Sequence, residues 1–184
     1  MVEILGISGS LRKESLNTRL LHLAAELMPE GSRLTTATLH GIPLYDGDVE
    51  EADGIPAAVE ALKDAIRKAD GVLLVTPEYN NGIPGVFKNA VDWVSRPPKD
   101  SAGVFRGRPF AVIGASPGGF GTLLSQNAWL PVLRTLETRF WSEGRFLLSR
   151  AHLAFTPEGG LADGKQQEML RGFLAGFAKF AGKG

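Results

Sequence analysis

The sequence predicts an α/β domain in which helices cover both faces of a parallel β-sheet. Short continuous apolar runs rich in β-branched residues, typical of strands buried on both faces, occupy residues 4–7, 72–75 and 110–115. Helical patterns separate these runs, and this alternation favours a doubly wound sheet. No repeat, linker or shift in composition divides the chain, so we expect a single domain over residues 1–184.

Each element follows from a local pattern. Pro56 and Pro84 suit the first turns of helices, and Gly31 and Gly71 follow helix ends. Five strands are expected in the common order 2-1-3-4-5. In chain order we predict a strand at 4–7, a helix at 16–28, an alternating edge strand at 34–39, a helix at 56–68, a strand at 72–75, a helix at 84–94, a strand at 110–115, a helix at 122–139, a fifth strand within 140–155 and a helix at 165–181.

Composition excludes several kinds of chemistry. The chain has no cysteine, so disulfides, thiolate zinc sites, iron–sulfur clusters and a cysteine nucleophile are excluded, and redox chemistry requires a bound cofactor. The three histidines lie far apart, and we expect no metal site. Twenty basic residues balance twenty acidic ones, which favours a small-molecule partner over nucleic acid or a membrane. The start of the sequence does not resemble a signal peptide, and we expect a cytoplasmic protein.

Three unusual loops follow the first, third and fourth strands, beyond whose carboxyl ends such sheets bind ligands. The first loop leads into a helix and contains Ser10, Arg12, Ser15 and Asn17. Amides at a helix start, together with hydroxyl and guanidinium groups, suit a terminal phosphate. The loop has neither the P-loop pattern nor a dinucleotide fingerprint, which favours a monophosphate. The alternative is an ordinary turn in which Ser15 is the helix N-cap.

The second and third loops suit a planar ligand. Residues 76–85 contain Pro77, Glu78, Tyr79 and Asn80. Such a loop can turn successive amides inward, toward the edge of a flavin ring, while an aromatic side chain covers one face. Residues 116–122 have three glycines within four positions, which allow bare backbone to approach a ring. Plain connections without a ligand are the alternative for both loops. The long connection 40–55 is also more typical of a functional segment than of an idle one.

The motifs together resemble the NAD(P)H-dependent FMN reductase family, whose members act on quinones, azo compounds, free flavins and chromate. They are, in order, Gly9-Ser10-Leu11-Arg12 with Ser15 and Asn17, Pro77-Glu78-Tyr79-Asn80, Lys88-Asn89-Ala90-Val91-Asp92-Trp93, and Ser116-Pro117-Gly118-Gly119. The resemblance extends from the first strand to the fourth helix. It implies a flavodoxin-like three-layer sandwich and an FMN-dependent enzyme that transfers two electrons from NADPH or NADH to a small acceptor by a ping-pong mechanism.

The resemblance also implies the roles of individual residues. The FMN phosphate would be held by Ser10, Arg12, Ser15 and Asn17, the ring would be lined by Pro77, Glu78, Tyr79 and Asn80, and the ring or ribityl chain would be met by Ser116 and Gly118. Leu16 and Gly119 are further cofactor-binding candidates. No side chain is implied as a catalytic residue. Glu14 would have to point away from the phosphate. The assembly implied is a homodimer or homotetramer with the flavin near the subunit interface.

Two other functions stay open on the sequence alone. The same fold serves flavodoxin-like electron carriers, although carriers usually have strong charge asymmetry and this chain is neutral. Gly114-Ala115-Ser116-Pro117-Gly118 matches a hydrolase nucleophile elbow, with His152 downstream, but Pro117 lacks the N–H that an oxyanion hole needs. We expect core or interface positions for Trp93, Trp129 and Trp141. Surface positions or contact with an NADPH 2′-phosphate are the alternatives for Arg96, Arg106 and Arg108.

Overall fold

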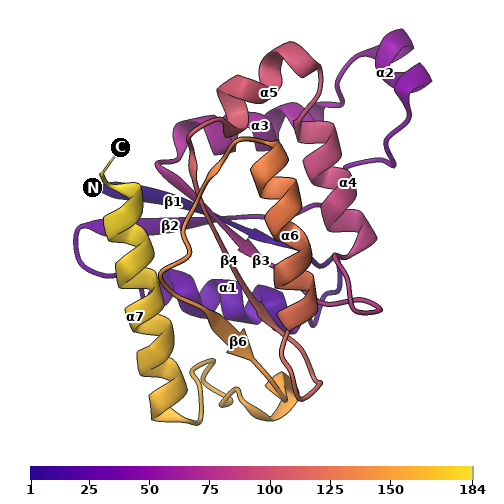
Figure 1. Cartoon of the computed structure of the whole chain (residues 1–184). Coiled ribbons are helices and arrows are strands. Elements are labelled where there is room, and N and C mark those ends of the chain that lie inside the picture. The colour runs from indigo at the N-terminus through magenta and orange to yellow at the C-terminus, as the bar shows by residue number, and fades with distance from the viewer. Residues whose placement is uncertain (184) are drawn as a thin grey trace.

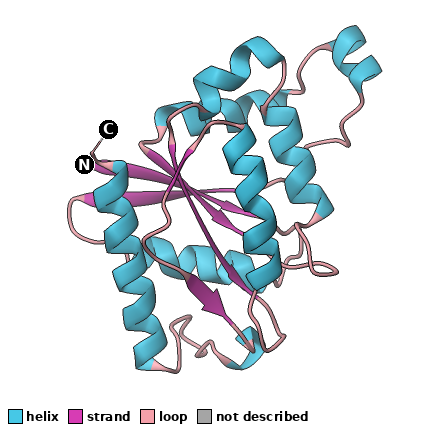
Figure 2. Cartoon of the chain, viewed as in Figure 1, coloured by secondary structure: helices cyan, strands magenta, loops and turns pink. Residues whose placement is uncertain are grey.

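The computed structural model of the protein describes residues 1–183 and contains a parallel sheet with helices on both faces (Figures 1 and 2). The strand order β2-β1-β3-β4-β5, with β6 also paired to β4, confirms the predicted order. Gly184, the last residue of the expected domain, lies outside the described range. The strands are β1 (Val2–Ser8), β2 (Ser32–Ala37), β3 (Gly71–Val75), β4 (Pro109–Ala115), β5 (Arg139–Phe140) and β6 (Phe146–Leu148).

The expected fifth strand is divided into two short strands. β5 pairs with the start of β4, and β6 pairs with its end, so both occupy the same edge of the sheet. Between them Trp141 is buried in the core, and a Cβ atom on Gly144 would lie 2.5 Å from its ring. The edge strand is therefore interrupted where the Trp141 indole packs closely against Gly144.

The helices form two layers that enclose the sheet (Figure 2). Residues of α1 and α7 share one core cluster with one face of the sheet, and residues of α3, α4, α5 and α6 share the other. Trp93, Trp129 and Trp141 are buried, which confirms their core positions. The helices are α1 (Leu16–Glu26), α2 (Gly47–Asp53), α3 (Ala57–Lys68), α4 (Gly85–Val94), α5 (Pro98–Phe105), α6 (Leu123–Thr135) and α7 (Gly164–Ala181), with a 3₁₀ turn η1 (Ala151–Leu153).

Two helical predictions need correction. The helix expected at 122–139 ends at Thr135, because Glu137 adopts a left-handed conformation with φ 57° and its carbonyl accepts a hydrogen bond from Gly107. α2 and α5 were not predicted, since both are short and neither has a long apolar stripe. No helix within residues 1–183 has the length and apolar character needed to cross a membrane.

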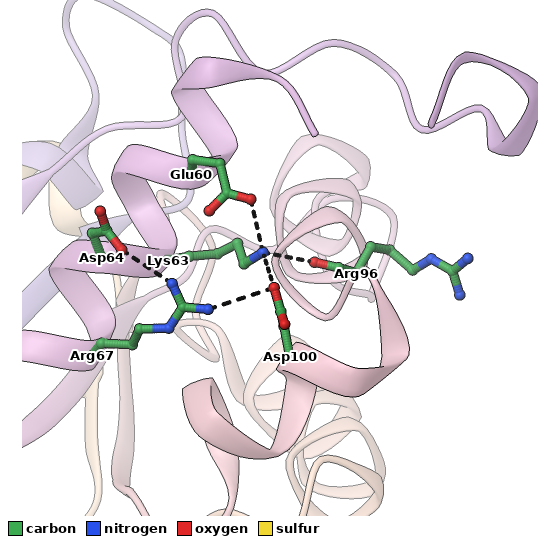
Figure 3. A network of polar contacts seen from close by, with 6 residues as sticks. All are labelled: Glu60, Lys63, Asp64, Arg67, Arg96 and Asp100. Atoms are coloured by element: carbon green, nitrogen blue, oxygen red, sulfur yellow. Dashed lines mark hydrogen bonds and ion pairs between the residues drawn. The ribbon is translucent and has the colours of Figure 1, made fainter. Parts of the chain in front are cut away.

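A fully buried lysine joins α3 to α5 (Figure 3). The Lys63 ammonium donates to Glu60 Oε1 at 3.0 Å, to the Arg96 carbonyl at 2.9 Å and to Asp100 Oδ2 at 3.0 Å. These three bonds use all three ammonium protons, which a buried charge requires. The hydrogen bond from Lys63 is the main reason that the pKa of Asp100 is lowered. The network thereby fixes the connection between α4 and α5.

An arm, defined here as residues 43–54, projects from the body and contains α2 (Figure 1). Its base is held to α4, where the Pro43 carbonyl accepts from Trp93 Nε1 at 2.9 Å and from Asn89 Nδ2 at 2.8 Å. Farther along, Glu50 Oε2 accepts from Arg96 Nε at 2.8 Å, and this bond is the main reason that the pKa of Glu50 is lowered. No residue of α2 is buried.

Candidate functional site

The β1 loop, residues 9–15, connects β1 to α1 and passes close to the sheet. Gly9 donates its N–H to Val75 O at 2.9 Å, and a Cβ atom at this position would lie 2.1 Å from the Phe87 ring. Glycine is therefore required for the close approach. Ser15 has an extended backbone and its Oγ accepts from Thr18 N at 3.2 Å, so it is the N-cap of α1.

The start of α1 can accept an anion. Its first turn has no acidic residue, and Glu14 is exposed, as the outward orientation requires. Ser10 is buried, and its Oγ accepts from Arg12 N at 3.2 Å, which keeps the Arg12 backbone beside the serine. Arg12 itself is exposed and forms no ion pair among residues 1–183. Backbone N–H groups at a helix start and a free guanidinium both favour bound phosphate.

The Asn17 side chain binds to β4, whereas those of Ser10 and Ser15 bind within their own segment. It is buried, and its side-chain amide donates to Ala115 O at 2.8 Å and accepts from Ala115 N at 2.9 Å. The oxygen and one N–H of the amide are therefore engaged with the end of β4. A single N–H remains for a ligand.

The β3 loop, residues 76–84, contains a tight hairpin. Tyr79 and Gly82 exchange backbone hydrogen bonds at 3.2 and 3.0 Å, and the two residues between them, Asn80 and Asn81, have φ angles of 50° and 62°. Asparagine tolerates this left-handed conformation, which two-residue turns of the I′ type require. The turn leaves 46% of Tyr79 exposed beside the loop.

Two side chains fasten the β3 loop to α6. Glu78 Oε2 accepts from the N–H groups of Leu124 at 2.8 Å and Ser125 at 3.0 Å. Because Thr122, the N-cap residue of α6, forms no side-chain cap, the carboxylate of Glu78 caps the helix instead. The buried Thr76 hydroxyl accepts from Trp129 Nε1 at 3.1 Å, next to Ser125 Oγ at 2.9 Å. Glu78 therefore directs its charge toward the helix.

The β4 loop, residues 116–122, is fixed at both ends. Ser116 donates its N–H to Leu148 O at 3.0 Å, and its hydroxyl donates to the Gly121 carbonyl. The Gly118 carbonyl accepts from Arg150 N at 2.9 Å. Phe120, at the tip, is 81% exposed. The loop is therefore tied to the segment after β6 but presents an aromatic ring to the surface.

The three loops enclose a cavity of about 90 Å³, hereafter the first cavity. Nine of the twelve residues predicted from the sequence line it. Asn80, Gly118 and Gly119 lie outside its lining, and their roles stay predictions. Ala115 and Pro117 also line the cavity but were not predicted, because they have no functional side chain and only precede and follow Ser116. The lining consists of Ser10, Arg12, Ser15, Leu16, Asn17, Pro77, Glu78, Tyr79, Ala115, Ser116 and Pro117.

A model of the NADPH-dependent FMN reductase family matches residues 2–153. The chain belongs to this family. An NAD(P)H-dependent FMN reductase of Pseudomonas aeruginosa is 43% identical over 170 residues, covering 92% of this chain and 90% of that protein. A quinone reductase of Escherichia coli K12 is 34% identical over 181 residues, covering 97% and 95%.

The fold comparison agrees with this assignment. The flavoenzyme NAD(P)H:(acceptor) oxidoreductase FerB from Paracoccus denitrificans superposes with a TM-score of 0.84 at 36% identity, covering 100% of this chain and 98% of that one. The chain thus has the flavodoxin-like fold that the sequence predicted. The family match covers residues 2–153 and so extends beyond the motifs quoted from the sequence.

The contacts of Ser116, of His152 and of three arginines do not favour the alternative roles considered for these residues. The Ser116 hydroxyl donates to a backbone carbonyl, and His152 lies exposed on η1, so no nucleophile–base pair is formed by these two residues. The three arginines considered for NADPH each have a partner within the fold. Arg96 binds Glu50, Arg106 binds Glu137, and Arg108 donates to the Val104 and Ala69 carbonyls.

Proposed function

We propose that this chain is an FMN-dependent NAD(P)H oxidoreductase that reduces quinones or similar small acceptors. The single observation that carries the proposal is the first cavity, where three loops that match the family motifs meet at the carboxyl ends of β1, β3 and β4. Bound FMN would supply the chemistry of two-electron transfer between NADPH or NADH and the acceptor. The chain supplies binding and orientation.

The β1 loop fits the phosphate end of FMN. Ser10 and Ser15 offer hydroxyl groups, Arg12 offers the only cationic side chain in the cavity lining, and the first turn of α1 offers free N–H groups. These groups match a phosphate monoester, which has about −1.5 to −2 charges near pH 7. Leu16 lines the cavity beside them. Asn17 contributes mainly by holding the α1 end of the site to β4.

The β3 and β4 loops fit the ring. A cavity of about 90 Å³ is smaller than the 300–1,000 Å³ typical of enclosed ligand sites. The cavity would therefore hold the phosphate end of FMN, and Pro77, Tyr79 and Ser116 would contact the ring and leave one of its faces accessible. An open face suits successive contact with a nicotinamide and an acceptor. The named relatives reduce FMN and quinones, which supports quinones as acceptors, with azo compounds, flavins and chromate as further candidates.

We also propose that residues 1–184 form one domain, that the enzyme acts in the cytoplasm, and that it is a homodimer or homotetramer. Two surfaces support self-association. A groove of about 400 Å³ lies between α4 and α6, with Val91, Val132 and Leu136 among its lining residues. The arm exposes 83% of Leu44, and a helix as short as α2 gains little stability unless it is packed against something.

The test identifies the cofactor before it measures activity. Purified protein is heated, and the released flavin is separated by chromatography against FMN, FAD and riboflavin. We expect FMN, together with benzoquinone-dependent oxidation of NADPH or NADH. Recovery of FAD alone, or of no flavin after reconstitution with FMN, would contradict the proposal. Activity confined to washed membranes would contradict the cytoplasmic location.

A further inference from the structure

A second cavity, of about 480 Å³, lies beside the β4 loop. The loop separates it from the first cavity, since Ser116 and Pro117 line the first and Gly119 lines the second. Arg150 and Leu153, from the segment after β6, and Gln166 of α7 also line it. Its volume falls within the range typical of small-molecule sites.

The backbone of Arg150 is in a conformation that arginine rarely adopts. Its φ and ψ are 46° and 38°, in the left-handed region where glycine and asparagine are favoured. Two hydrogen bonds to the β4 loop hold it there, from Arg150 N to Gly118 O and from Ala151 N to Ser116 O, both at 2.9 Å. Strained residues of this kind cluster at ligand-binding positions. If position 150 served only to form a turn, glycine would adopt this conformation with less strain.

The groups at this cavity suit an aromatic group that bears phosphate. Arg150 is exposed and forms no ion pair among the described residues. Leu153 is 71% exposed and offers an apolar surface for a ring to cover. Asp163 also lines the cavity, and its carboxylate caps α7 by accepting from Lys165 N at 2.9 Å, so one of its oxygens is already bound. Arginine is well suited to phosphate because its planar fork donates two parallel bonds.

We propose that the second cavity binds the adenosine half of NADPH or NADH and that Arg150 pairs with one of its phosphates. This inference rests on the proposed use of NAD(P)H as electron donor. The nicotinamide half lies at the open ring face on one side of the β4 loop, and the phosphate-linked adenosine half lies on the other. A dinucleotide suits this arrangement because its two halves are joined by a pyrophosphate that can cross the loop.

The first experiment compares donors of different length on FMN-loaded enzyme. Arg150→Ala should raise KM for NADPH or NADH about tenfold, the value of one charge-assisted hydrogen bond, and leave kcat unchanged. Reduced nicotinamide mononucleotide lacks the adenosine half, so its KM should stay the same. Arg145→Ala, which removes an exposed arginine on the other side of β6, is the matched control. An equal change in KM for the dinucleotides and for reduced nicotinamide mononucleotide would overturn the inference.

The second experiment measures binding without turnover. ADP-ribose and 2′-phospho-ADP-ribose are titrated calorimetrically into wild-type protein and Arg150→Ala, and the affinity should fall about tenfold. If both probes lose affinity, Arg150 contacts the pyrophosphate. If only 2′-phospho-ADP-ribose loses affinity, Arg150 contacts the 2′-phosphate. Unchanged affinity for both would overturn the inference even if the enzyme proved to be a reductase. Absence of reduction with every donor would count against the proposed function instead.

A third variant separates binding from folding. Arg150→Gly relieves the left-handed backbone and should raise Tm, while it weakens the two ADP-ribose probes as Arg150→Ala does. A structural role for the side chain predicts the reverse, a lower Tm with unchanged probe binding. That result would overturn the inference.

Discussion

Asn17 and Ala115 form a closed pair of hydrogen bonds between residues that are 98 positions apart in the chain. The side-chain amide satisfies both the N–H and the carbonyl of Ala115, at the end of β4. Both residues are buried and both line the first cavity. The pair therefore sets the distance between the start of α1 and the β4 loop, which are opposite sides of the proposed FMN site.

Asn17→Ala should lower the free energy of unfolding by about 2 to 4 kcal/mol, because it leaves two buried backbone groups without partners. Urea unfolding measures the change, with Asn127→Ala, an exposed amide on α6, as control. The binding of FMN and of riboflavin should weaken together. A variant of normal stability that loses only FMN would show instead that Asn17 is a phosphate ligand.

The sheet and most of the lining of the first cavity could be predicted from local pattern. The runs at residues 4–7, 72–75 and 110–115 are apolar because both faces of a central strand are covered, and loops at their carboxyl ends must meet. The short edge strands β5 and β6 have no such run. Their position depends on Trp141, whose packing against Gly144 is a tertiary contact.

The roles of polar side chains within the site were harder to predict. Glu78 lines the first cavity, and its position beside the ring stays a prediction, but the sequence did not indicate that its carboxylate also caps α6, whose N-terminus has no side-chain cap of its own. The partner of Asn17 is likewise distant in sequence. Spacing identifies which residues meet at the sheet edge, whereas the hydrogen bonds that each one forms depend on the completed fold.

Stability should fall in acid as the buried Lys63 loses the charge of its partner Asp100. The pKa of Asp100 is lowered from 3.8 in the folded state, mainly by Lys63, so its contribution is complete above that value and is lost as pH falls toward the folded-state pKa. Asp100→Asn should flatten this part of the pH profile when urea unfolding is measured from pH 7 to pH 3. Glu51→Gln, an exposed carboxyl on α2, is the control. A slope unchanged by Asp100→Asn would mean that the network does not cause the acid sensitivity.

The mass in solution should be at least twice 19.7 kDa, measured by light scattering at micromolar concentration. Leu44→Asp places a charge on the exposed apolar part of the arm and should shift the protein toward monomer. Met169→Asp changes an exposed apolar residue on α7 and should not. A fully active wild-type monomer would contradict the proposed interface.

Steady-state kinetics should show that donor and acceptor use the same ring face in turn. NADPH or NADH varied against a benzoquinone should give parallel double-reciprocal lines, the result of a substituted-enzyme mechanism. The expectation follows from the proposed site, since Tyr79 is the aromatic side chain that lines the first cavity and would cover one ring face, so that the other would stay open. Intersecting lines would indicate simultaneous binding at separate places.

The last prediction concerns Arg12, the cationic side chain of the first cavity. Removing it leaves Ser10, Ser15 and the amides of α1, which have no net charge. A charge-assisted hydrogen bond contributes about 1.5 to 3 kcal/mol, so Arg12→Ala should weaken FMN binding roughly 10- to 150-fold. Riboflavin has no phosphate and should bind almost as before.

The measurement is a paired titration of both flavins into apoprotein of the wild type, Arg12→Ala and Lys13→Ala. Lys13 is the neighbouring exposed cation and does not line the cavity, so it controls for the general loss of positive charge. Selective loss of FMN in Arg12→Ala alone assigns the guanidinium to the phosphate. Equal loss of both flavins would mean that the change acts through folding or ring packing, and an unchanged FMN affinity would exclude Arg12 from the site.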